Sequence, residues 1–163
     1  MNPFDPKRLI LIHGLEGSSQ GDKAVLLRSL FPEMMTPDFR GSLEERMSFL
    51  HPLLGEQTGW TIIGSSLGGL MAAIFTIQYS HQVRKLVLLA PALFLAEFTS
   101  GEYHPVDVPA IVYHGRQDAV VPIEQTRQIA SQVFQNLVFN EVDDDHRLFQ
   151  TMHRIDWTAL LND

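Results

Sequence analysis

The 163-residue sequence predicts an α/β protein with a mostly parallel sheet of about six strands and helices on both faces, a three-layer sandwich. Short continuous apolar runs recur along the chain, as in strands that are covered on both faces. Helical patterns lie between these runs, and this alternation favours parallel pairing. No repeat and no Gly/Ser-rich linker interrupts the pattern, so residues 1–163 are expected to form a single domain.

The sequence contains five clear strand candidates and one weaker one. Each clear one ends at a glycine, a proline or a charged residue, which are common strand terminators. A three-residue run, Met34–Thr36, completes the set of six. The five clear runs are Leu9–Ile12, Trp60–Ile63, Lys85–Ala90, Ala110–Tyr113 and Leu137–Asn140.

The predicted helices fill the intervals. Leu70 to Ile77 is apolar on almost every side, so this helix should be buried against the sheet. Pro122 stands where a first helical residue belongs, ahead of a further apolar stripe. Two other stripes keep helical spacing, one before the second clear strand and one near the end of the sequence: Ala24, Leu27, Leu30 and Phe31, then Leu148, Met152, Ile155 and Ala159.

Composition excludes several classes of protein. Twelve Lys and Arg against nineteen Asp and Glu leave a formal charge of −7, which argues against nucleic acid or an anionic membrane as a partner. The absence of cysteine excludes a thiolate nucleophile and any Cys-ligated metal. No apolar run reaches the roughly 18–20 residues of a membrane helix, and Leu9–Ile12 is too short for a signal-peptide core. We therefore expect a soluble, cytoplasmic protein.

The most informative motif is Gly64-Ser65-Ser66-Leu67-Gly68, a Gly-x-Ser-x-Gly. A predicted strand precedes it directly and an apolar helix follows it directly, which is the setting of a nucleophile elbow. In such a turn the central hydroxyl stands above the sheet, and a side chain at Gly64 or Gly68 would collide with neighbouring backbone. The motif predicts Ser66 as a nucleophile. A plain Gly/Ser-rich turn before a helix is the alternative.

A serine hydroxyl needs a base to take its proton and an acid to orient that base. In this architecture the acid and then the histidine follow the serine, each after a later strand. Asp118 follows the strand that ends at Tyr113, and His146 follows the last strand. Asp118 as an ordinary turn residue and His146 as a surface residue are the alternatives. His153, about two turns into the final helix, is the nearest rival base.

Two backbone N–H groups are needed to bind the oxyanion of a tetrahedral intermediate. We expect one from Leu67, directly after the nucleophile, and one from Leu15, in the loop after the first strand. Gly14 allows the backbone to approach closely. His13 is expected to be structural, with its ring packed under this loop and hydrogen-bonded to the backbone.

Other polar residues near these motifs have less specific interpretations. The run Asp143–Asp145 predicts a solvated turn; a metal site is the alternative, but no suitably spaced ligands accompany it. Glu16 and Ser18 lie near enough in sequence to touch a substrate. We expect no metal and no cofactor.

Taken together, the His-Gly after the first strand, the elbow, the His-Gly-x-x-Asp-x-x-Val-Pro stretch that starts at His114 and the late histidine resemble the α/β-hydrolase family. The form Gly-Ser-Ser-Leu-Gly-Gly is similar to small cap-less bacterial esterases. The resemblance spans Leu9 to about Trp157 and implies a serine hydrolase without a cofactor. By matching positions it assigns a triad of Ser66, Asp118 and His146 and an oxyanion hole of Leu15 and Leu67.

The chain departs from many members of that family at two places. About sixteen residues separate Leu93 from Ala110, too few for a cap domain. We expect Phe94, Leu95 and Phe98 from this segment to form the wall of an open substrate pocket. Secondly, Asp145 stands before the late histidine, where relatives often carry glycine.

These observations predict a carboxylesterase that acts on small soluble esters with short acyl chains, through an acyl-enzyme on Ser66. Two alternatives remain: a thioesterase or peptidase on the same triad, and a non-catalytic binding module that retains the fold. If Asp118 is not the acid, Glu97 is the next candidate.

Overall fold

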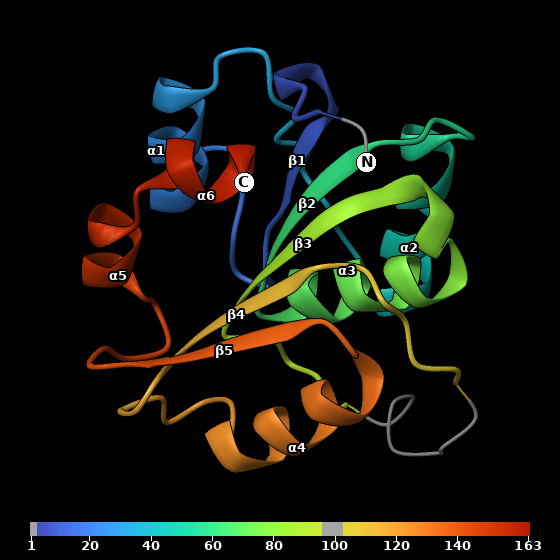
Figure 1. Ribbon diagram of the computed structural model, residues 1–163. Coiled ribbons are helices and arrows are strands. Elements are labelled where there is room, and N and C mark those ends of the chain that lie inside the picture. The colour runs from blue at the N-terminus through green and yellow to red at the C-terminus, as the bar shows by residue number, and fades with distance from the viewer. Residues whose placement is uncertain (1–2, 96–102) are drawn as a thin grey trace.

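A computed structural model describes residues 3–95 and 103–163 and confirms the α/β class (Figure 1). Its sheet has five strands, all parallel, and their spatial order is their order along the chain. A sixth strand, which we predicted, is not formed. The strands are β1 (Leu9–Ile12), β2 (Trp60–Ser65), β3 (Val83–Leu89), β4 (Ala110–Gly115) and β5 (Leu137–Val142).

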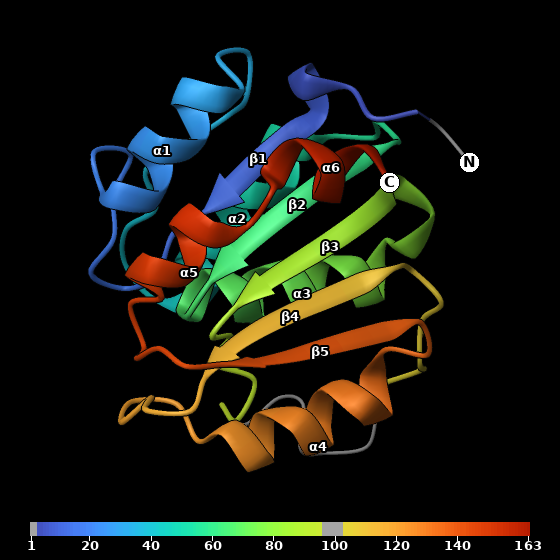
Figure 2. The ribbon, with the colours of Figure 1, turned by 60° about the vertical axis from the view of Figure 1, so that its left-hand side comes forward.

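Helices cover both faces of the sheet, as predicted (Figure 2). Three helices, the second, third and fourth along the chain, pack on one face. The first, fifth and sixth helices pack on the other face. No helix of the described residues has the length and apolarity to cross a membrane. The helices are α1 (Asp22–Leu30), α2 (Leu43–Leu54), α3 (Leu67–Gln78), α4 (Ile123–Val133), α5 (Phe149–Arg154) and α6 (Trp157–Asn162), with short 3₁₀ turns at Pro6–Arg8 and Ser80–Gln82.

Successive side chains along the strands pack alternately into two separate hydrophobic cores, one on each face of the sheet. On β1, Ile10 and Ile12 pack with α2 and α3, whereas Leu9 and Leu11 pack with α1 and α6. All four are buried, as are all seven residues of β3. Continuous apolar runs are therefore required here because both faces of the sheet are covered.

The predicted strand Met34–Thr36 is reduced to one bridge between Met35 and Ile10. Met35 donates its N–H to the Leu9 carbonyl at 2.8 Å and accepts from the Leu11 N–H at 3.0 Å. The next residue that would donate on this side is Pro37, which has no N–H, so the ladder stops. The bridge lies on the side of β1 away from β2. The chain therefore moves one way across the sheet through α1 and then back the other way through α2. Because both crossovers are right-handed, the two helices lie on opposite faces.

The predicted final helix is interrupted. Ile155 is extended, with ψ of 129°, and Asp156 then caps a new helix by accepting the Ala159 N–H at 3.0 Å. This break changes the helical phase, so Trp157 and Leu161 face the core and Ala159 is exposed. The prediction of one face through Ala159 was therefore wrong.

Candidate active site

Ser66 occupies a strained turn between β2 and α3. Its φ of 55° and ψ of −117° lie in a region that residues with a side chain rarely adopt. Four neighbours hold the turn. The Ser66 carbonyl accepts the N–H groups of Gly69 at 2.9 Å, Leu70 at 3.3 Å and Ala92 at 3.0 Å. The Ser66 N–H donates to the Leu89 carbonyl at 3.0 Å. The strain is thus maintained by backbone hydrogen bonds from α3 and from the end of β3.

The two glycines of the motif allow this turn to form. A Cβ at Gly64 would lie 2.5 Å from the Gly68 carbonyl oxygen and 2.8 Å from the Ala72 Cβ. A Cβ at Gly68 would overlap the carbonyl oxygen of Ile12, at the end of β1. The first turn of α3 therefore crosses the ends of β1 and β2 in backbone contact, with room only for glycine at both positions.

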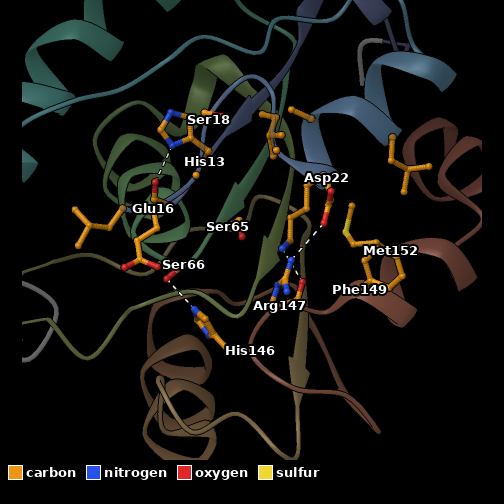
Figure 3. Close-up of a pocket in the computed structure, with 18 of the residues that line it drawn as sticks. His13, Glu16, Ser18, Asp22, Ser65, Ser66, His146, Arg147, Phe149 and Met152 are labelled. Carbon is orange, nitrogen blue, oxygen red and sulfur yellow. Dashed lines mark hydrogen bonds and ion pairs between the residues drawn. The ribbon is translucent and has the colours of Figure 1, made fainter.

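The structure brings Ser66, Asp118 and His146 together. The Ser66 hydroxyl lies 3.1 Å from His146 Nε2, and Figure 3 shows the two side chains pointing toward each other. On the other side of the ring, His146 Nδ1 lies 2.8 Å from Asp118 Oδ2. With Nδ1 protonated, it donates to the carboxylate, and Nε2 is free to accept from the serine.

The Asp118 side chain is buried, and both of its carboxylate oxygens have hydrogen-bond partners. Its carboxylate is 0% exposed, against 23% for the His146 side chain. Oδ1 accepts the N–H groups of Val120 and Val121, both at 2.8 Å, which leaves Oδ2 for the histidine. Asp118 is thus a turn residue as well as the partner of His146, because the same turn that it closes fixes the direction of its free oxygen.

The acidic run before His146 builds the loop that carries it. Asp144 accepts the N–H and the hydroxyl of Thr151 at 2.9 and 2.8 Å and so caps the start of α5. Burial acts to raise the pKa of the Asp144 carboxyl, but its hydrogen bonds from Thr151 and Asp145 bring that pKa below its usual value. Asp145 accepts the Arg147 N–H at 2.9 Å and has no positive φ, so glycine is not required there.

Two hydrogen bonds to the backbone hold the His13 ring in the loop after β1. Its Nε2 accepts the Phe39 N–H at 2.9 Å and its Nδ1 donates to the Gly14 carbonyl at 2.7 Å, so the ring is neutral. A Cβ at Gly14 would stand 3.1 Å from the Ser66 Cβ. Within the described residues, the N–H groups of Leu15 and Leu67 donate no hydrogen bond to the protein. Both N–H groups therefore remain candidates for the oxyanion hole.

A cavity of about 760 Å³ opens beside Ser66, between the loop after β1, α1 and α5. Phe94 and Leu95 do not line it, contrary to our pocket prediction, because the wall comes from the opposite face of the sheet. Phe98 and Glu97 lie outside the described residues. Glu16, Ser18 and the rival His153 do line the cavity, which has an apolar wall of Leu11, Ala24, Leu26, Phe149 and Met152.

The mouth of this cavity carries exposed apolar side chains. Leu15 is 66% exposed, Val120 63% and Phe149 54%, and all three line the cavity. They come from the loop after β1, the turn of Asp118 and the segment after His146. Clustered exposed apolar groups of this kind are typical of binding surfaces.

A buried residue beside Asp118 was not predicted as a site residue, although it begins the motif that contains Asp118. His114, on β4, is 0% exposed. Its Nε2 lies 3.0 Å from the Val121 carbonyl oxygen and 3.3 Å from Asp118 Oδ2. Its position at the end of a central strand, four residues before the acid, was the only clue that the sequence offered. Among residues 3–95 and 103–163 no group of three or more His, Asp or Glu is arranged to hold a metal ion.

The fold has many solved counterparts. A predicted CIB-like hydrolase from Thermoplasma acidophilum superposes with a TM-score of 0.74 at 23% identity, over 95% of this chain and 86% of that one. Est1E from Butyrivibrio proteoclasticus, solved with ferulic acid, gives 0.73 at 17% identity over 94% and 88%. An α/β serine hydrolase homologue from Coxiella burnetii gives 0.69 at 20% identity over 95% and 83%. At these identities the likeness shows the fold alone.

Sequence comparison is more specific about the family. A search of curated proteins returned no match. The sequence profile of the phospholipase/carboxylesterase family matches residues 56–162, about two thirds of the chain and a range that includes the elbow, Asp118 and His146. The chain therefore belongs to the phospholipase/carboxylesterase family of α/β-hydrolases.

Proposed function

We propose that this hydrolase is a serine carboxylesterase with Ser66 as nucleophile, His146 as general base and Asp118 as the acid that orients it. The observation that carries the proposal is the continuous contact from the Ser66 hydroxyl through both nitrogens of His146 to Asp118, at 3.1 and 2.8 Å. A base in contact with a hydroxyl and held by a buried carboxylate is the arrangement that activates serine.

The reaction follows from the position of each group. Ser66 Oγ attacks the ester carbonyl carbon while His146 Nε2 takes its proton. The resulting oxyanion accepts from the free N–H groups of Leu15 and Leu67. When the intermediate collapses, the C–O bond to the alcohol breaks and the alcohol leaves with the proton from His146. Water then repeats the sequence on the acyl-enzyme, releasing the carboxylic acid and restoring the Ser66 hydroxyl.

The cavity favours small esters with short acyl chains. Its apolar wall is interrupted by charged side chains, because Glu16, Asp22, Lys23 and Arg147 line the same space. A long acyl chain would have to lie against these groups and remove water from them, which costs free energy. A short chain can stay on the apolar wall near Ser66.

Covalent labelling tests the proposal. A fluorophosphonate probe should label the wild-type protein at a peptide that contains Ser66, and p-nitrophenyl butyrate should be hydrolysed. Ser65→Ala is the matched control, because Ser65 lies beside the nucleophile and lines the same cavity. Absence of both labelling and turnover in folded protein would favour a binding module. Labelling together with faster turnover of thioesters or peptides would favour the other hydrolases.

A further inference from the structure

His114 is tightly fixed although it makes no contact with Ser66 or His146 at hydrogen-bonding distance. Its ring is stacked on Phe139 of β5, with centroids 6.3 Å apart and planes 16° apart. The Arg127 guanidinium lies over the Phe139 ring at 4.5 Å and is paired with Glu141 at 2.7 Å. The orientation of the His114 ring is thus set by a series of contacts that begins at the surface of α4.

The surroundings of His114 determine where its proton lies. Nε2 faces two oxygens, the Val121 carbonyl at 3.0 Å and Asp118 Oδ2 at 3.3 Å, so it must carry hydrogen. Within the described residues, Nδ1 is buried without a hydrogen-bond partner. Burial lowers the pKa of His114, against the raising effects of Val121 and Asp118, so the ring is neutral. The one N–H of the ring is therefore directed at the turn that carries the acid.

Val121 links the two residues through its main chain. Its carbonyl accepts from His114, and its N–H donates to Asp118 Oδ1 at 2.8 Å. Because His114 restrains the main chain of Val121, it also restrains the Asp118 carboxylate, and the direction of that carboxylate decides whether Oδ2 meets His146. The His114 N–H also places positive potential beside Oδ2, which stabilises the buried negative charge.

We propose that His114 is a positioning residue for the hydrolysis reaction, holding the Asp118 carboxylate in line with His146 through the Val121 carbonyl and through its contact with Oδ2. This inference rests on the proposed serine mechanism. A purely structural ring would matter only for stability. A positioning residue affects the chemical step in molecules that are already folded.

Two substitutions at His114 test whether the N–H donor at Nε2 is needed, as distinct from the aromatic ring. His114→Gln keeps an N–H near the position of Nε2, whereas His114→Asn carries a similar amide that is too short to reach the Val121 carbonyl. We expect kcat for p-nitrophenyl butyrate to fall roughly tenfold in His114→Asn with KM within about twofold, because one hydrogen bond beside a charged group is lost. His114→Gln should recover most of kcat. His51→Asn is the control, since His51 also packs on aromatic rings, Phe75 and Tyr79, away from the site.

Folding and mechanism are distinguished by further measurements. Titration with a fluorophosphonate gives the concentration of competent sites, so kcat refers to folded enzyme only. In an Asp118→Asn background the loss caused by His114→Asn should disappear if His114 acts through Asp118. An unchanged kcat in His114→Asn, equal losses in the Gln and Asn variants, or an undiminished loss in the Asp118→Asn background would each overturn the inference. Lack of activity in the wild type would instead contradict the proposed function.

Discussion

Gly115, the last residue of β4, lies in backbone contact with Asp144, since a Cβ at position 115 would overlap the Asp144 carbonyl oxygen. The Gln117 N–H donates to that same carbonyl at 3.0 Å. The turn that carries Asp118 and the loop that carries His146 are therefore joined through their main chains as well as through the two side chains.

Gly115→Ala should damage both stability and activity, because the methyl group can be accommodated only if the two loops move apart. We expect a loss of roughly 1–3 kcal/mol in the free energy of unfolding, as for other overpacked sites, and a decrease in kcat. Urea unfolding and p-nitrophenyl butyrate kinetics measure the two effects. Gly21→Ala is the control for stability, since a Cβ there would lie 3.3 Å from its nearest atom, the Ser18 carbonyl oxygen, whereas a Cβ at Gly115 would overlap Asp144. An equal loss of stability in the two variants would contradict the steric argument.

Ser66→Ala should abolish esterase activity and leave the fold intact, because only the nucleophilic oxygen is removed. The loss in kcat should approach the roughly 10⁶-fold effect of deleting a triad nucleophile. Circular dichroism and thermal unfolding check the fold. If Ser65→Ala eliminated activity while Ser66→Ala retained most of it, the assignment of the nucleophile would be wrong.

Asp118→Asn should lower kcat by about 10³–10⁴-fold with little change in KM, since an amide cannot hold His146 in the correct tautomer. Oδ1 accepts two backbone N–H groups, so the amide oxygen of Asn would keep that position. The amide nitrogen would then face His146, and its N–H would meet the N–H at Nδ1 of the ring. Steady-state kinetics give both constants. A near-normal kcat would move the acid to another residue, with Glu97 tested next.

The buried His114 should make stability fall at acidic pH. Burial lowers its pKa in the folded state from the ordinary value of 6.5, although Val121 and Asp118 act in the opposite direction. The unfolded chain therefore binds this proton first as the pH falls, and the stability contributed by the neutral ring is lost below about pH 6.5. Urea unfolding between pH 7.5 and pH 5 should show a smaller decrease for His114→Gln than for wild type; equal decreases would argue against this origin.

The increase of kcat/KM with acyl-chain length should stop after the first few carbons. Each buried methylene contributes about 0.8 kcal/mol where an apolar wall is available, and the charged side chains of the cavity end that wall. We expect higher kcat/KM for p-nitrophenyl acetate and butyrate than for laurate or palmitate, and no rate increase above the micelle concentration. A series that keeps rising through the C12 ester would point to a lipase.

Much of the fold was predictable because strands covered on both faces require continuous apolar runs. The exceptions have local causes. Pro37 ends the pairing of Met35, and Asp156 starts a new helix where one stripe was expected to continue. Helix α2 was not predicted, although Ser42 and Glu45 form a capping box at its start; Pro52 lies inside it. Leu30, counted in the stripe of α1, is 46% exposed.

The candidate site was predictable where sequence spacing determines position, and not where packing does. Ser66, Asp118 and His146 each follow a strand of one parallel sheet, so their loops must meet at the same edge. The walls of the cavity depend on how α1 and α5 pack over the opposite face. Motif spacing does not specify that packing, and neither Phe94 nor Leu95 contributes to the wall. The contact of His114 with Val121 likewise depends on the path of the turn.

The order of the strands has a consequence for how the enzyme matures. Every parallel pair joins strands that are consecutive along the chain, so the sheet can grow by one strand at a time as the polypeptide is synthesised. The proposed nucleophile and acid enter with β2 and β4, whereas the proposed base, His146, enters only after β5, at the end of that growth. A nascent chain that still lacks the last strand holds a serine without a base. Under the proposed mechanism, hydrolytic competence is therefore delayed until the last strand has joined the sheet.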